Sequence, residues 1–132
     1  MALTTRHQQW LDRDVWCFMG LPMDKITMQK SIDYCFEHID TNEQLFLSTA
    51  NVNFLVSAYD DEAFFYSVIH SDLAVVDGSP IVWLSRLLGI HYPERVAGSS
   101  LFALMTDRPT AWRVFFFGGM DSVADQACAN IN

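Results

Sequence analysis

The sequence predicts an α/β fold in which an open, mostly parallel β-sheet is covered by helices on both faces. Short apolar segments typical of strands alternate along the chain with segments of helical periodicity, the pattern expected of a parallel sheet with helical crossovers. Residues 73–76 and 114–117 are continuously apolar, as in strands that are buried on both faces. The length of 132 residues fits one domain, 1–132, because no repeat or low-complexity linker divides it.

The first predicted elements are a strand over residues 15–18 (VWCF) and a turn over residues 20–24 (GLPMD). Thr27 can cap the helix that follows. Apolar residues of that helix recur at spacings of three and four, which puts them on one face that should lie on the sheet: Ile32, Cys35, Phe36 and Ile39.

The middle of the chain alternates in the same way. Residues 44–49 (QLFLST) are predicted to form a strand. Residues 52–70 have a helical pattern in two pieces, and Asp60 or Asp61 can cap the second piece. Residues 73–76 (LAVV) are then a fully apolar strand.

An Asp-Gly pair, Asp77-Gly78, joins the strand at 73–76 to the next helix. Pro80 suits the first turn of that helix, and Gly89 is placed to end it. Residues 91–98 (HYPERVAG) then read as a loop.

The last part of the chain completes the predicted alternation. Ser99 or Ser100 can cap a helix over residues 101–106. Residues 114–117 (VFFF) are predicted to be a buried strand, from which a turn leads into a helix beginning at Val123.

Composition excludes several functions. The net charge is −8, and the 8 basic residues are spread singly, so no patch could neutralise a nucleic-acid backbone. No apolar run approaches the roughly 18 residues of a membrane helix, and the N-terminus lacks the apolar core of a signal peptide, so we expect a cytoplasmic protein. Apolar residues make up 51% of the chain, which indicates a substantial core or a surface that needs a partner.

Neither a disulfide framework nor a zinc site is indicated. The chain has an odd number of cysteines and no CxxC pair. We expect each of them to be a small buried apolar residue: Cys17, Cys35 and Cys128. The histidines show no metal-ligand spacing: His7, His38, His70 and His91. A metal site built with Asp72 and Asp77 is the less favoured alternative, so no metal is expected.

Polar or glycine-rich loops follow three predicted strands. The carboxyl ends of parallel strands lie at one edge of a sheet, where open α/β folds bind their ligands. We therefore expect a crevice at this edge, formed by Thr49-Ala50-Asn51, Asp77-Gly78 and Gly118-Gly119.

Each of these residues has an ordinary structural reading and a functional one. Asp77 is a common turn residue, but after four apolar residues its carboxylate would be partly desolvated and a better proton acceptor. Thr49 and Asn51 suit the binding of sugar hydroxyls or diphosphate oxygens, and helix capping explains them equally well. Gly118-Gly119 could admit a phosphate to backbone N–H groups, although the pair does not complete a GxGxxG motif.

Two arginines are candidates for contact with an anionic group. Arg86 belongs to the helix that Pro80 begins, and Arg95 to the loop at 91–98. Each also fits a surface or capping role.

The order of four motifs along the chain resembles the WecG/TagA/CpsF family of bacterial glycosyltransferases: STAN, SDLAVVDGSPIVWLSRLLG, PERVAGSSL and VFFFGG. The resemblance begins at the GLPMD turn and is strongest from Ser71 to Leu101. It implies a Rossmann-like enzyme that works without metal or other cofactor. Such an enzyme moves a sugar of the N-acetylmannosamine type or a related one, with inversion, from a UDP donor to a polyprenyl-diphosphate-linked acceptor in exopolysaccharide, teichoic acid or other cell-wall polymer synthesis.

The resemblance also implies roles for individual residues. Asp77 matches the aspartate proposed as general base, and Thr49 and Asn51 match a TxN motif beside it. We expect substrate contacts from Gly78, Arg86 and Arg95, and weaker donor contacts from Gly118 and Gly119. The chain departs from the family where Gly-Ser/Thr-Asp-Leu is usual, because it reads Gly98-Ser99-Ser100-Leu101 and lacks that carboxylate.

The resemblance covers only the N-terminal half of the family. We therefore expect a truncated enzyme, inactive alone and prone to form homo-oligomers. The remainder would carry further strands, much of the donor site and a peripheral contact with the inner face of the cell membrane. The rival hypothesis is a catalytically silent binding fragment in which Thr49, Asn51 and Asp77 are only turn and cap residues.

Overall fold

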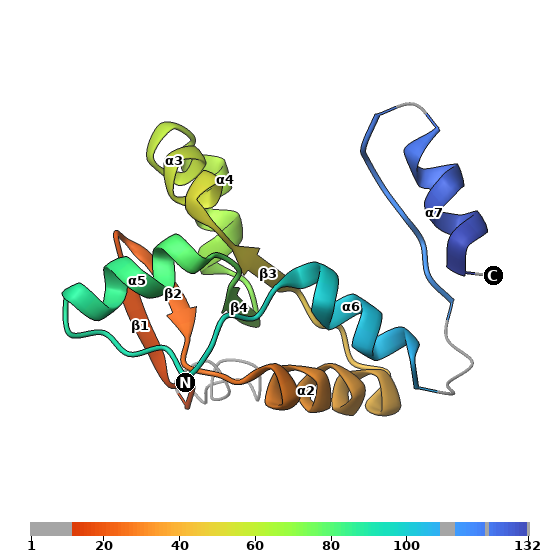
Figure 1. Cartoon of the computed structure of the whole chain (residues 1–132), viewed down its shortest axis with the longest axis horizontal. Coiled ribbons are helices and arrows are strands. Elements are labelled where there is room, and N and C mark those ends of the chain that lie inside the picture. The colour runs from red at the N-terminus through yellow and green to blue at the C-terminus, as the bar shows by residue number, and fades with distance from the viewer. Residues whose placement is uncertain (1–11, 109–112, 121, 132) are drawn as a thin grey trace, which may run out of the picture.

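The computed structural model describes residues 12–108, 113–120 and 122–131 (Figure 1). Helices and strands alternate along much of this part of the chain. In chain order they are β1 (Val15–Phe18), β2 (Leu21–Asp24), α2 (Met28–Thr41), β3 (Leu47–Ala50), α3 (Val52–Asp60), α4 (Glu62–Ile69), β4 (Leu73–Val76), α5 (Ser79–Leu87), α6 (Gly98–Thr106) and α7 (Val123–Ile131).

The mixed α/β class is confirmed, but the described residues do not form one open, mostly parallel sheet. They form two sheets of two strands: β1 and β2 are antiparallel, and β3 and β4 are parallel. The prediction therefore placed the parallel pair correctly and overestimated the size of the sheet. Two segments account for the difference, the one after Gly20 and the one around Phe115.

The segment predicted as a turn after Gly20 is a strand. The turn is Met19-Gly20, where both residues have positive φ angles, of 49° and 91°. Leu21 and Met23 are fully buried in β2, and β2 contacts β4. The Pro in this strand hid the alternation, although a proline is tolerated in a strand at the edge of a sheet.

The parallel pair is built on a crossover through α3 and α4. Its register places Thr49 opposite Val75 and Ala50 opposite Val76. All four residues of β4 are buried. The edge of β4 that faces away from β3 carries no paired strand within the described ranges, and other groups satisfy it: the Asp24 carboxylate accepts from Ala74 N–H, and the N–H of Val96 donates to Val76 O.

The long helix α2 packs against α6 and, through Met28 and Tyr34, against the parallel strand pair. Its buried residues Ile32, Cys35 and Phe36 form a cluster with Leu101 and Met105 of α6. Figure 1 shows the two helices side by side.

The predicted face of α2 is wrong at its last position. Ile39 is 41% exposed, and the neighbouring His38 is buried instead. The imidazole of His38 lies against the Tyr34 ring and its Nδ1 bonds the Tyr34 carbonyl one turn back, so its polar atom is satisfied within the helix.

The predicted strand at 114–117 is absent, because the structure assigns this segment no regular element. Phe115 and Phe117 are 87% and 96% exposed, whereas Phe116 lies against Phe102 of α6. Figure 1 shows this segment and α7 projecting from the remainder of the described chain. A continuous apolar run makes a buried strand only when neighbouring strands cover it.

Helix capping follows the predictions at two of three places. Thr27 caps α2 through a bond from Lys30 N–H, and Asp61 caps α4 through a bond from Phe64 N–H. The prediction for α6 is wrong, because the helix begins at Gly98 and no side chain of its own N-cap residue, Ala97, bonds it.

The three cysteines differ in burial. Cys35 is buried, as predicted, and burial raises the pKa of its thiol. Cys17 and Cys128 are exposed, so the prediction is wrong for them. Each lies in an element that has an open face, β1 or α7.

Candidate active site

Asp77 follows β4 directly and is held at both its backbone and its side chain. Its N–H donates to Ala50 O at 2.8 Å, which extends the parallel ladder by one residue. Its Oδ2 accepts the N–H of Gly98, the first residue of α6, at 3.0 Å. Asp77 therefore does for α6 what Ser99 or Ser100 was predicted to do, and the amino end of a helix is a favourable place for a negative charge.

The carboxylate of Asp77 is half-buried and has one oxygen to spare. Among the described residues, the hydrogen bond to this carboxylate is the one that Gly98 N–H donates to Oδ2. Oδ1 is therefore available to a ligand. A carboxylate fixed by one oxygen can present the other to a ligand in a defined direction.

Thr49 lies beside Asp77 on the same face of the parallel pair. The register pairs Thr49 with Val75, and Asp77 is two residues beyond Val75, so the side chains share one side of the strands. Gly98 is the neighbour of both: a Cβ added there would be 2.8 Å from Thr49 Cγ2 and 3.3 Å from Thr49 Oγ1. Only glycine lets the start of α6 come this close to Thr49 while it binds Asp77.

Asn51 and Gly78 stand at the adjoining ends of the two loops. Asn51 Oδ1 accepts Phe54 N–H at 3.2 Å and caps α3, so the structural reading of this residue is realised. A Cβ on Gly78 would lie 3.8 Å from the backbone of Asn51, so the two loops are in contact. Gly78 is the N-cap of α5, where no side chain bonds the first turn.

The two candidate arginines are placed differently. Arg86 lies in the last turn of α5, roughly 10 Å along the helix axis from the loop that holds Asp77. Arg95 is exposed and precedes Val96, whose N–H bonds the last residue of β4. The backbone of Arg95 is thus near the strand ends, and that of Arg86 is not.

Gly118 and Gly119 are not brought to the strand ends. They follow the irregular segment around Phe116, and both have positive φ angles, of 90° and 93°. Figure 1 shows that this segment projects from the part of the chain that contains β3 and β4.

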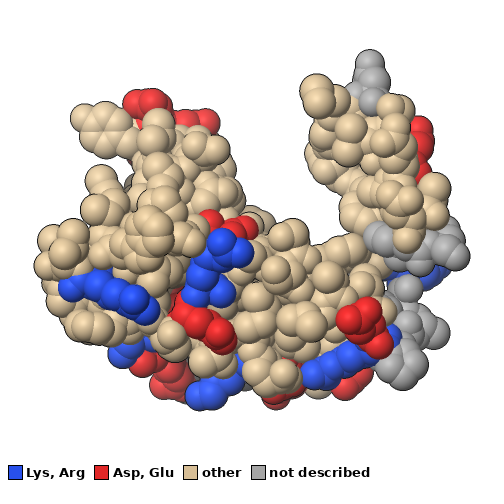
Figure 2. Space-filling model, in the orientation of Figure 1, with Lys and Arg blue, Asp and Glu red and all other residues tan. Residues whose placement is uncertain are grey.

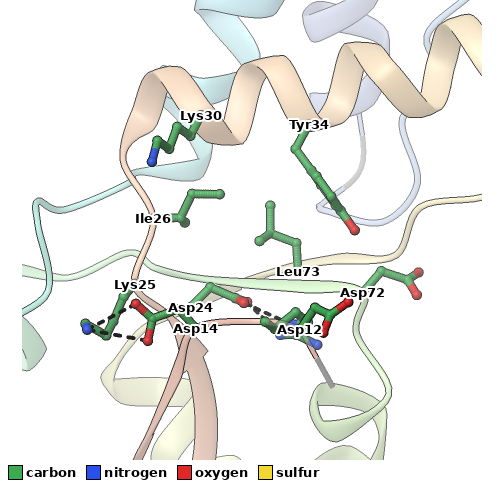
Figure 3. Close-up of a pocket in the computed structure, with 10 residues that line it drawn as sticks. Asp12, Asp14, Asp24, Lys25, Ile26, Lys30, Tyr34, Asp72 and Leu73 are labelled. Carbon is green, nitrogen blue, oxygen red and sulfur yellow. Dashed lines mark hydrogen bonds and ion pairs between the residues drawn. The ribbon is translucent and has the colours of Figure 1, made fainter. Parts of the chain in front are cut away.

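A cavity of about 390 Å³ lies at the opposite, amino end of β4 (Figure 3). It was not predicted from the sequence. Four of its charged residues pair with one another. Arg13 makes an ion pair with Asp24 at 2.6 Å, and Lys25 makes one with Asp14 at 3.1 Å. Burial and the nearby carboxylates, Asp72 first among them, raise the pKa of Tyr34, which points into this cavity from α2.

The alternative of a metal bound by Asp72 and Asp77 is excluded. Asp72 precedes β4 and Asp77 follows it, so the whole strand separates them, a span of roughly 16 Å of extended chain. Asp72 Oδ2 accepts Phe46 N–H at the amino end. Within residues 12–108, 113–120 and 122–131, no group of three or more His, Cys, Asp or Glu could hold an ion. His7 lies outside these residues.

A larger cavity, of about 710 Å³, lies between α3 and α5. The described residues that line it are almost all apolar and include one carboxylate: Met19, Val52, Leu55, Val56, Ala58, Tyr59, Asp60, Phe65, Ile81 and Leu84. The sequence analysis missed this groove. The signal was present in α3, where Val52, Val56 and Tyr59 recur at spacings of four and three on a face that stays exposed.

The structure thus places a half-buried carboxylate, a hydroxyl and an amide at the carboxyl edge of a parallel strand pair, the edge at which α/β enzymes bind their substrates. Residues 16–132 match the family model described as "Glycosyl transferase WecG/TagA/CpsF family". The chain belongs to this family.

A relative from Bacillus spizizenii is named N-acetylglucosaminyldiphosphoundecaprenol N-acetyl-beta-D-mannosaminyltransferase. It is 30% identical over 88 residues, which are 65% of this chain and 34% of the relative. The chain therefore spans about a third of the length of that protein. No helix among the described residues is long and apolar enough to cross a membrane.

Proposed function

We propose that the chain is the part of an inverting glycosyltransferase that activates the acceptor. The enzyme transfers an N-acetylmannosaminyl or related group from a UDP-sugar to a polyprenyl-diphosphate-linked sugar, in the synthesis of a cell-surface polysaccharide or cell-wall polymer. Family membership and the acceptor in the relative's name support this assignment. The observation that carries it is the Asp77 carboxylate, which Gly98 holds by one oxygen.

Asp77 acts as the general base in this reaction. The acceptor hydroxyl oxygen attacks the anomeric carbon of the donor, and the bond from that carbon to the diphosphate oxygen breaks. UDP leaves with the bonding electron pair, and Oδ1 of Asp77 takes the hydroxyl proton. Attack from the side opposite the leaving group inverts the configuration at this carbon.

The neighbours of Asp77 position the substrates. Thr49 offers a hydroxyl beside the base, and the amide nitrogen of Asn51 is left to donate while its oxygen caps α3. Arg95 is better placed than Arg86 to meet a diphosphate. Gly118 and Gly119 contribute to the donor site if the rest of the protein brings them to this edge.

The other parts of the proposal concern the additional length of the relative, of which the match covers 34%. Further strands beyond those described here would extend the parallel pair into an open, Rossmann-like sheet and complete the donor site. Because the acceptor is a membrane lipid, the enzyme works at the inner face of the cell membrane, to which it binds peripherally. The reaction as proposed uses no metal or other cofactor.

Transfer assays on the full-length protein test the proposal. With UDP-N-acetylmannosamine and a short-chain prenyl-diphosphate-linked N-acetylglucosamine, Asp77→Asn should lower kcat by roughly 10² or more and leave the donor KM unchanged, because only the proton acceptor is lost. Asp40→Asn, which neutralises an exposed carboxylate on α2, is the matched control and should retain normal turnover. Near-normal turnover of Asp77→Asn would remove Asp77 from the base role.

The rival hypothesis, a silent binding fragment, has an observation in its favour, since Asn51 caps α3 and Asp77 bonds the first residue of α6. It predicts that Asp77→Asn and the wild type are equally inactive with every UDP-sugar. A panel of UDP-sugars, tested with the same acceptor, separates the two hypotheses.

A further inference from the structure

The apolar groove between α3 and α5 begins at the candidate active site. Val52, in the first turn of α3, directly follows Asn51. Ile81, in the first turn of α5, comes three residues after Gly78. Since Asn51 and Gly78 are in contact, one end of the groove lies at the loops that carry the candidate base.

The groove runs along both helices away from these loops. Val56 and Tyr59 follow Val52 on α3, and Leu84 follows Ile81 on α5. Val56, Tyr59 and Leu84 are 57%, 92% and 49% exposed, so both walls present apolar surface to solvent. Figure 2 shows mainly uncharged side chains over this part of the molecule.

The lining suits an aliphatic chain better than a protein. Protein interfaces carry a polar rim with hydrogen bonds, whereas Asp60 is the only charged residue among the described residues that line this groove. Its volume of about 710 Å³ is within the range of small-molecule sites, and the flexible Met19 at its border can adapt to a branched ligand.

We propose that this groove binds the prenyl chain of the lipid-linked acceptor. The inference rests on the proposed function for the identity of its ligand. An acceptor of this kind joins a sugar and a diphosphate to a long apolar chain, so placing the reacting hydroxyl at Asp77 requires an apolar surface within reach of the same loops. The diphosphate then lies near the amino ends of α3 and α5, which favour negative charge, and the prenyl chain follows the groove from Val52 toward Tyr59.

Two substitutions of the same residue type on the same helix test the groove. Leu84 lines it, whereas Leu87 is 83% exposed and does not. In the full-length protein, Leu84→Gln should weaken binding of farnesyl diphosphate roughly fivefold to tenfold, because part of the apolar contact is lost, and Leu87→Gln should change it less than twofold. Neither variant should change the affinity for inorganic diphosphate. Val56→Gln, on the opposite wall, is a second test if Leu84→Gln does not fold.

Crosslinking locates the chain directly. A farnesyl diphosphate that carries a diazirine at its far end should label peptides from 52–60 and 79–87. Labelling confined to other segments, or equal affinity of the Leu84 and Leu87 variants, overturns the inference. A wild type that self-associates and becomes monomeric in Leu84→Gln would assign the groove to a second copy of the chain and also overturn it.

The binding measurements separate this inference from the proposed function. If the wild type transfers no sugar but Leu84→Gln selectively weakens the binding of farnesyl diphosphate, the assignment of the groove holds and the transferase proposal fails. If transfer proceeds and the two leucine variants bind alike, only the groove fails.

Discussion

Carboxylates that lie beside the two ends of β4 are used in opposite ways. At the amino end, Asp24 takes two bonds from the Arg13 guanidinium and one from Ala74 N–H, and is 6% exposed. Asp72 is equally buried and accepts Phe46 N–H. At the carboxyl end, Asp77 is half-buried and engages one oxygen.

The difference separates structural carboxylates from an available one. Asp24 substitutes for a strand on the outer edge of β4, because its Oδ2 accepts a ladder N–H that no strand in the described ranges reaches. Asp77 lies where the ladder ends, and among the described residues its Oδ2 alone accepts a hydrogen bond. Stability should therefore depend on the amino end, and chemistry on the carboxyl end.

Asp24→Ala should cause the largest loss of stability. It leaves the Arg13 guanidinium, 14% exposed, without its carboxylate and Ala74 N–H without an acceptor. Removing one partner of a buried ion pair costs about 3–5 kcal/mol in free energy of unfolding, which urea denaturation measures. Asp14→Ala, at a carboxylate that is 71% exposed, should cost less than about 1 kcal/mol. Equal losses for the two variants would contradict the comparison.

The pH dependence of stability should report on a buried tyrosine, Tyr92, in the core cluster that includes Leu21 and Met23 of β2. Burial raises the pKa of Tyr92 to about 12, and the negative charges of Cys17 and Asp24 add to the effect. Above pH 10 the unfolded chain loses this proton before the folded chain does, so stability falls between pH 10 and about 12. Two pKa units correspond to a loss of roughly 3 kcal/mol.

Thermal unfolding of Tyr92→Phe across this range provides the measurement. The variant should lack that part of the decline, while at pH 7 it loses only the hydroxyl's weak 3.4 Å bond to Trp16 O. Curves of the same slope for both proteins would show that Tyr92 does not cause the decline.

Local chemistry made much of the fold predictable. The strand at 73–76, the caps Thr27 and Asp61 and the helix after Pro80 each depend on a few neighbouring residues. The failures depend on distant ones. Residues 114–117 have the composition of a buried strand, but the described structure provides no neighbour to pair with them.

The candidate site also has features that could be predicted from the sequence and features that could not. The rule that parallel strands end at one edge was enough to bring Thr49, Asn51 and Asp77 together. It gave no indication of Gly98, because a bond between residues 77 and 98 depends on how the loop at 91–98 folds back. The groove was missed because apolar helix faces are ordinarily assigned to the core.

Gly98→Ala tests how closely the carboxyl end is packed. The new methyl group would meet Thr49 Cγ2 at 2.8 Å, so α6 or Thr49 must shift, at a cost of about 1–3 kcal/mol in free energy of unfolding. Gly78→Ala is the matched control, because its Cβ finds only ordinary contacts at 3.8 Å and its φ of 176° suits any residue. Urea denaturation that ranks Gly78→Ala as the more damaging variant would refute this account of the site.

Asp77→Asn should change stability least, by less than about 1 kcal/mol in either direction. The amide oxygen of asparagine can accept the Gly98 N–H as the carboxylate does, so the link to α6 survives and only the charge is lost. Asp24→Asn removes the charge that faces Arg13 and should lose several times more stability, although the chemical change is the same. Urea denaturation of this matched pair decides between the two uses of a carboxylate. If Asp77→Asn were as damaging as Asp24→Asn, Asp77 would be a structural clamp like Asp24, and low transfer activity in the variant would say nothing about a base.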